Sequence, residues 1–115
     1  MNIYALSSGR GPSGIAIVRV SGKDILKVCM NLTKLKKINS NVVNYCKFYD
    51  PQNDKIIDPE ALLLWFPGPN SYTGDDLAEF QVHGSNAVIN ALLKVLSEQD
   101  NCRLAEPGEF TKIAF

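Results

Sequence analysis

The sequence SSGRGPSGIAIVRVSG, residues 7–22, contains three glycines with the G-x-G-x-x-G spacing of a dinucleotide-binding loop. Such a loop requires a helix after the glycines, since the first amides of that helix hold the pyrophosphate. Residues 15–20 (IAIVRV) are rich in β-branched side chains, which predict a strand instead. The P-loop is disfavoured too, because Ile-Ala follows Gly14 where that motif needs Lys and Ser or Thr. We therefore predict two strands joined by a glycine-rich loop, whose missing side chains would let a ligand approach the backbone closely.

Outside this stretch, the chain alternates predicted strands with predicted helices. Hydrophobic patterning and turn residues predict strands at residues 3–6, 15–20, 42–49, 55–58, 61–66, 75–82 and 102–104. Helices are predicted after Ser21, after Ser85 and from the stretch 106–109, with the two serines as N-caps and Pro107 near the first position of the last helix. We expect Pro59 to break one strand, and the apolar run 61–66 to be a central strand covered on both faces. The predicted fold class is α/β (α+β), a mixed β-sheet with about three helices.

Length and composition indicate one ordinary globular domain. The chain has 115 residues, of which 45% are hydrophobic and 21% charged. A formal net charge of zero gives no electrostatic reason to expect nucleic acid or an anionic membrane as a partner. The basic run at residues 34–37 keeps an RNA contact open as an alternative to a solvated loop. The last helix has no C-terminal stop signal, so we expect residues 1–115 to be the N-terminal piece of a longer protein.

The cysteines and the single histidine predict neither a disulfide framework nor a metal site. Cys29, Cys46 and Cys102 are odd in number and form no C-x-x-C pair. With no signal peptide or long apolar span, they indicate a reducing cytosol, a cytoplasmic location and no membrane partner. Zinc is not expected, because no thiol pair accompanies His83. No Ser, Cys or orienting acid stands at a distance from His83 in the sequence that would indicate a catalytic site. We therefore interpret His83 as part of a strand-to-helix turn and assign no catalytic residue.

Two charged residues interrupt the apolar pattern of the predicted strands. Arg19 shares one face of its strand with Ile15 and Ile17, and Glu79 shares a face with Leu77 and Gln81. An ionised side chain on a half-buried sheet is costly unless it is paired or hydrogen-bonded. One interpretation is that the two residues pair with each other or reach water at strand ends. The other is a pocket, rimmed by the glycine and proline-glycine loops, where the carboxylate reads a flat ring bearing N–H donors and the guanidinium holds an acid or carbonyl.

Three blocks of sequence, in order, resemble the N-terminal domain of the bacterial and organellar tRNA modification GTPases, the MnmE or TrmE family. They are IAIVRVSG (residues 15–22), WFPGPNSYTGDDLAEFQVHG (residues 65–84) and AEPGEFTKIAF (residues 105–115). The similarity runs through the whole chain, and the part FPGPNSYTGDD is highly specific. The resemblance implies an α/β fold akin to the folate-binding domain of the glycine-cleavage aminomethyltransferases, with residues 1–115 forming one folate-binding and dimerisation domain.

The same resemblance implies a function. The domain would form a homodimer and bind a 5-formyltetrahydrofolate-type cofactor, with the folate-contacting Arg and Glu of the family falling on Arg19 and Glu79. In the full-length family protein, a helical domain interrupted by a GTPase domain would follow, and the GTPase domain would hold GTP, potassium and magnesium. With a flavoprotein partner, MnmG (GidA), that protein would add an aminomethyl-type group, as in carboxymethylaminomethyl modification, to the wobble uridine of certain tRNAs.

Two departures from the family pattern accompany the resemblance. The third folate contact of the family is a Lys that would lie beyond Phe115, and the usual His-Gly-Gly turn is His83-Gly84-Ser85 here. The sequence also contains no GTPase motif. Two alternatives stay open beside folate binding, namely a pure dimerisation module and a module that binds tRNA directly through residues 34–37.

Overall fold

The computed structural model describes residues 1–8, 14–69 and 74–114, and these form one mixed β-sheet with helices packed on it. The strands are β1 (Asn2–Leu6), β2 (Ile15–Gly22), β3 (Asn44–Tyr49), β4 (Ile56–Phe66), β5 (Asp76–His83) and β6 (Cys102–Leu104). Their order across the sheet is β3-β4-β5-β2-β1-β6, and all neighbours are antiparallel except β1 and β6. Together with three helices among the described residues, this sheet confirms the predicted α/β class.

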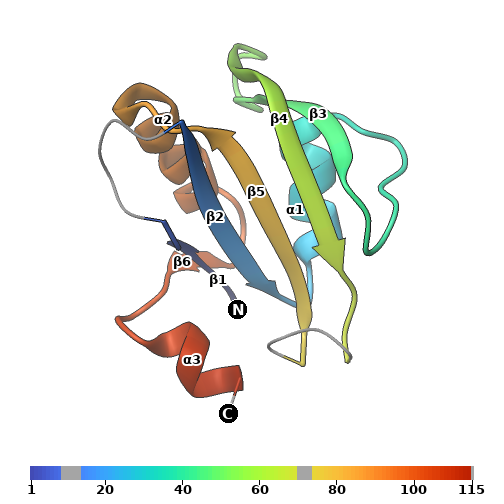
Figure 1. The fold of residues 1–115 in the computed structure, drawn as a ribbon, viewed down its shortest axis with the longest axis vertical. Helices are drawn as coiled ribbons and strands as arrows, with labels where there is room; N and C mark the ends of the chain where they lie inside the picture. The colour runs from blue at the N-terminus through green and yellow to red at the C-terminus, as the bar shows by residue number, and fades with distance from the viewer. Residues whose placement is uncertain (9–13, 70–73, 115) are drawn as a thin grey trace.

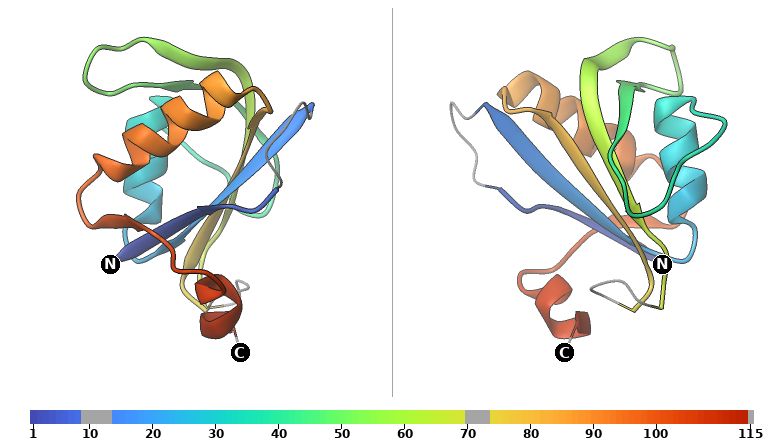
Figure 2. Two further views of the ribbon diagram at one scale, coloured as in Figure 1. Left: turned by 90° about the vertical axis from the view of Figure 1, so that its left-hand side faces the viewer. Right: turned by 45° about the vertical axis from the view of Figure 1, so that its right-hand side comes forward.

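The two longer helices cover only one face of the sheet. Helices α1 (Ile25–Thr33) and α2 (Asn86–Ser97) both lie behind the sheet in Figure 1, and both lie on one side of it in the left view of Figure 2. The short helix α3 (Glu109–Ala114) follows β6 and lies apart from them, beyond the lower end of the sheet. We call the sheet face that points away from α1 and α2 the open face.

Alternation along β2 shows which side chains enter the core. Ala16, Val18 and Val20 are at most 1% exposed and pack toward α1 and α2. Ile17 and Arg19 point the other way and are half-buried on the open face. Because side chains in a strand alternate with a period of two, β2 contributes one row to the core and one row to the open face.

Strand β4 differs from its prediction in two ways. The two predicted segments form one strand that runs through Pro59. The pairing between β3 and β4 skips this residue through a register shift between Cys46 and Phe48, so the missing N–H of the proline removes no paired position. The prediction of cover on both faces is wrong as well. Leu62 and Leu64 are half-buried on the open face, because both longer helices pack on the opposite one.

The start of α1 also departs from the prediction that Ser21 caps it. Ser21 belongs to β2, and its Oγ donates a hydrogen bond to a carbonyl of β5 at 3.2 Å. The helix begins after Asp24, whose N–H donates to Oδ1 of Asn2 at 3.2 Å, so a residue distant in the sequence satisfies this donor. At α2 the predicted cap is confirmed, because Oγ of Ser85 accepts the N–H of Val88 at 3.2 Å.

The glycine-rich stretch leads into a strand. Gly14 is followed directly by β2, so the structure confirms the predicted strand and excludes a dinucleotide-binding loop or a P-loop there. Residues 9–13 and 70–73, where the rims of the site are predicted, lie outside the described residues.

Candidate functional site

Arg19 and Glu79 lie directly opposite each other on β2 and β5, with both side chains on the open face. Nε of Arg19 donates to Oε2 of Glu79 at 3.4 Å, and Nε2 of Gln81 donates to the other carboxylate oxygen at 3.1 Å. The side chain of Arg19 is 42% exposed and that of Glu79 is 18% exposed. The structure therefore brings together the two charged residues that the strand pattern singled out.

The pair keeps most of its hydrogen-bonding capacity. Among the described residues, Arg19 uses only its Nε, which leaves both Nη groups available to a ligand. Each oxygen of the Glu79 carboxylate accepts one hydrogen bond, whereas an ionised carboxylate offers about four acceptor positions. These two side chains can pair with each other and bind a ligand at the same time, so the two interpretations of the sequence are compatible.

Sequence reasoning placed Gln81 on the same strand face as Glu79 but assigned it no role. Its amide fixes one carboxylate oxygen of Glu79 and so helps to set the orientation of that group. The signal was present in the sequence, because residues two apart on a strand share a face. A polar amide beside a half-buried carboxylate is the expected way to satisfy it.

The open face around the pair is apolar and borders a hollow. Leu64 of β4 lies directly opposite Glu79. A hollow of about 400 Å³ lies beside Arg19. It is lined by β1 and by the chain that leads from β6 into α3, and its walls include Ala5 and Phe110. Glu79 is on the adjacent strand and is not part of this lining. A flat ring with a polar edge suits these surroundings, since apolar side chains can contact its face while the charged pair binds its edge.

A second polar cluster joins β4 to the end of β5. Asp58 is fully buried, and its Oδ2 accepts the backbone N–H of His83 at 2.8 Å. Nδ1 of His83 lies 2.9 and 3.0 Å from the two carboxylate oxygens, and the N–H of Glu60 donates to Oδ1 at 3.0 Å. Sequence reasoning found no acid for His83, because 25 residues separate it from Asp58. His83 is the last residue of β5 and precedes the Ser85 cap of α2, so these contacts anchor the strand end at the predicted strand-to-helix turn.

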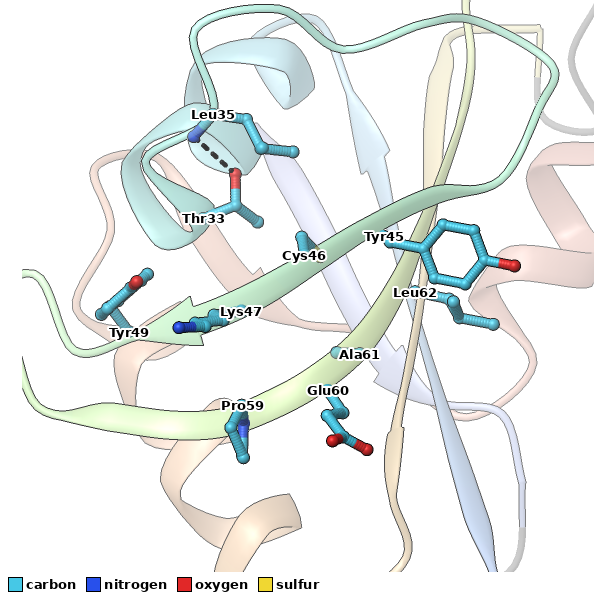
Figure 3. A pocket seen from close by; sticks show the side chains of 10 residues that line it. All are labelled: Thr33, Leu35, Tyr45, Cys46, Lys47, Tyr49, Pro59, Glu60, Ala61 and Leu62. Carbon is cyan, nitrogen blue, oxygen red and sulfur yellow. Dashed lines mark hydrogen bonds between the residues drawn. The ribbon is translucent and has the colours of Figure 1, made fainter.

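A second hollow, of about 630 Å³, lies over the β3–β4 hairpin at the far edge of the sheet from β1. Figure 3 shows Lys47 and Glu60 extending from its two strands, with the ring of Tyr45 at one side. Burial raises the pKa of the Cys46 thiol, which also lines this hollow, to about 11, so the thiol stays protonated near neutral pH. Among the described residues no ion pair joins Lys47 to Glu60, whereas Arg19 and Glu79 contact each other, so the Arg19–Glu79 pair remains the better candidate.

The basic run at residues 34–37 is partly engaged within the chain. Nζ of Lys34 lies 3.0 Å from Oδ1 of Asp54 and 4.2 Å from the centroid of the Tyr49 ring. These contacts occupy one of the three lysines of the run with a carboxylate and an aromatic face. They therefore weaken the case for direct RNA binding at this place.

Other kinds of site find no support in the part of the chain that the structure describes. No group of three His, Cys, Asp or Glu side chains there is placed to hold a metal ion. Its helices are too short or too polar to cross a membrane. All three cysteines are free thiols, and burial raises the pKa of Cys29, Cys46 and Cys102, so none is poised as a nucleophile.

Comparison with known proteins places the chain in a family. The family model described as GTP-binding protein TrmE N-terminus matches residues 2–115. The chain is 56% identical over 115 residues to the tRNA modification GTPase MnmE of Pelagibacter ubique, which covers 100% of this chain and 26% of that protein. It is 45% identical over 113 residues to the MnmE of Zymomonas mobilis, covering 98% of this chain and 26% of that protein.

The similarity extends to a mitochondrial protein of a eukaryote. A mitochondrial tRNA modification GTPase of Dictyostelium discoideum is 41% identical over 119 residues, which cover 98% of this chain and 23% of that protein. The chain thus spans about a quarter of the length of these relatives. It belongs to the TrmE family of tRNA modification GTPases, in which it corresponds to the N-terminal domain.

Proposed function

We propose that this chain is the folate-binding and dimerisation domain of a tRNA modification GTPase, with 5-formyltetrahydrofolate or a related tetrahydrofolate as its ligand. The observation that carries the proposal is the Arg19–Glu79 pair, half-buried on an apolar sheet face. The place of both residues in the sequence blocks that resemble the family supports it. The family match over residues 2–115 supports it further.

The proposed contact is between the carboxylate of Glu79 and the edge of the pterin ring. That edge presents two adjacent N–H donors, on ring N3 and on the 2-amino group, which match the two oxygens of a carboxylate. The available Nη groups of Arg19 would bind carbonyl or carboxylate oxygens of the same ligand. A bound tetrahydrofolate supplies a one-carbon unit, and these residues bind and orient it.

For the full-length protein we propose GTP hydrolysis coupled to wobble-uridine modification of tRNA in the cytoplasm. The names of the relatives, which are tRNA modification GTPases, support this activity. The present sequence has no GTPase motif, so GTP, potassium and magnesium would bind in other parts of that protein. The flavoprotein MnmG is the proposed partner in the reaction.

Homodimerisation is the second part of the proposal. Large apolar side chains exposed near the open face support it, among them Ile15 at 55% and Leu104 at 60% exposure. Sedimentation with and without 5-formyltetrahydrofolate separates this proposal from its alternatives. A dimer that never binds the folate would favour the pure dimerisation module. Steeply salt-dependent binding of tRNA to the chain would favour the RNA-binding module.

The ligand itself is tested by calorimetric titration of the chain with two compounds. We expect 5-formyltetrahydrofolate to bind and p-aminobenzoylglutamate, which carries the same tail without the pterin, to bind at least about tenfold more weakly, because the pterin edge makes the charge-assisted contacts. Equal affinity for the two compounds would show that the pterin is not recognised. Absence of binding by 5-formyltetrahydrofolate would contradict the folate proposal as a whole.

A further inference from the structure

The chain after β6 forms a wall of the hollow beside Arg19. The backbone N–H of Ala105 donates to the carbonyl of Tyr4 at 2.8 Å, which extends the β1–β6 pairing by one residue. The chain then leaves the sheet at Glu106 and enters α3. We call residues 106–111 the strap. Along its whole length the strap lines the 400 Å³ hollow, whose opposite wall is formed by β1 and Arg19.

One ion pair fixes the strap to the sheet. Nη1 and Nη2 of Arg103, in β6, donate to Oε1 and Oε2 of Glu109, at 2.8 and 2.5 Å. Oε1 of Glu109 also accepts the N–H of Glu106 at 2.8 Å, which closes the turn between the two residues. The carboxylate therefore ties the first turn of α3 both to β6 and to the beginning of the strap.

The Arg103–Glu109 pair contributes more to the position of the strap than to the free energy of unfolding. Its side chains are 43% exposed for Arg103 and 18% exposed for Glu109, and a partly exposed ion pair adds little to the free energy of unfolding. A bidentate guanidinium–carboxylate contact nevertheless restricts the direction and distance of the two groups. The contact restricts the separation between the strap and β6, and β6 is joined through β1 to β2, the strand that carries Arg19.

We infer that Arg103 and Glu109 are positioning residues of the ligand site, which hold the strap at the distance where Phe110 and Arg19 face the same hollow. This inference rests on the proposed folate function, because the ligand that would occupy the hollow is the same one. Neither residue needs to touch the ligand. Their effect is to keep the wall in place before binding, which lowers the ordering cost of association and slows release.

The test measures affinity and release of 5-formyltetrahydrofolate for the chain and for the Arg103→Gln, Glu109→Gln and double variants. Glutamine at position 109 keeps an oxygen that can accept the N–H of Glu106, so the turn is preserved. We expect each single variant to bind about tenfold more weakly, mainly through faster release, and the double variant to lose no more than either single one. Arg103→Lys should recover only part of the affinity, since lysine cannot form the bidentate contact.

A matched control and a measurement without ligand distinguish a local effect on the strap from destabilisation of the whole fold. Lys34→Gln removes another partly exposed ion pair, away from the hollow, and should leave affinity unchanged. In the absence of ligand, amide exchange of the strap should quicken about tenfold in Arg103→Gln while the thermal midpoint stays within about 2 °C. Unchanged affinity and exchange in a chain that binds the folate would overturn this inference alone. Failure of the unaltered chain to bind would overturn the proposed function with it.

Discussion

Replacing Glu79 by glutamine should weaken binding of 5-formyltetrahydrofolate by about a hundredfold or more, because one charge-assisted hydrogen bond, worth about 1.5–3 kcal/mol, is lost and the other becomes a weaker, neutral one. The substitution keeps the size of the side chain. Among the described residues, the only ion pair that it removes is the one between Glu79 and Arg19. Glutamine also places an N–H₂ group against the donor edge of the pterin, which adds an unsatisfied donor. The affinity is measured by calorimetric titration.

Further variants test whether the loss of affinity in Glu79→Gln comes from the carboxylate at this site. Arg19→Gln should weaken binding by a smaller factor, about tenfold, and the Arg19→Gln/Glu79→Gln pair should show coupling, because the two side chains contact each other. Glu98→Gln removes the same charge from the exposed C-terminal end of α2 and should leave affinity unchanged. If Glu79→Gln bound the folate as well as Glu98→Gln does, the assignment of the carboxylate to the pterin edge would be wrong.

The largest effect on stability is expected at Phe80, in the middle of β5. Its side chain is fully buried, and its ring centroid lies 4.8 Å from that of Phe48, with a tilt of 49°. On the two neighbouring strands, Val18 and Leu63 lie directly opposite and are fully buried too. Phe80→Ala would leave a cavity that rigid strands cannot close, so we expect the free energy of unfolding to fall by about 3–5 kcal/mol.

Urea denaturation followed by the fluorescence of Trp65, the single tryptophan, measures this loss. Tyr45→Ala provides the matched control, because it removes an aromatic ring of similar size from the same sheet at a position that is 83% exposed. That variant should change the free energy of unfolding by no more than about 0.5 kcal/mol. A loss below about 1 kcal/mol for Phe80→Ala would show that the core is not packed around this residue.

Much of this fold could be predicted from local sequence, because the deciding signals were local. The β-branched run of β2 and the serine cap of α2 identify their elements without reference to the rest of the chain. Strand β4 was different. Whether Pro59 ends a strand depends on the register of the neighbouring strand, and the bulge that accommodates it is formed jointly with β3. Cover of β4 depends on where α1 and α2 pack, which no local pattern specifies.

Some contacts of the site could likewise be predicted from local sequence, and others could not. Arg19 and Glu79 could be predicted to share an environment, since each broke the apolar alternation of its own strand. The contact between Asp58 and His83 could not, because it joins residues 25 positions apart through a strand end whose place is set by tertiary packing. The contact of Arg103 with Glu109 spans only six positions, yet it requires the strap to turn back toward β6, which the local sequence does not specify.

We propose that the open face beside Arg19 and Glu79 binds the pterin of a folate. Amide ¹H–¹⁵N spectra of the chain, recorded with and without saturating 5-formyltetrahydrofolate, test this proposal residue by residue. We predict that the largest shifts occur at Arg19, Glu79 and Phe110. Shifts concentrated instead around Tyr45 and Lys47, at the hollow of the β3–β4 hairpin, would contradict the claim.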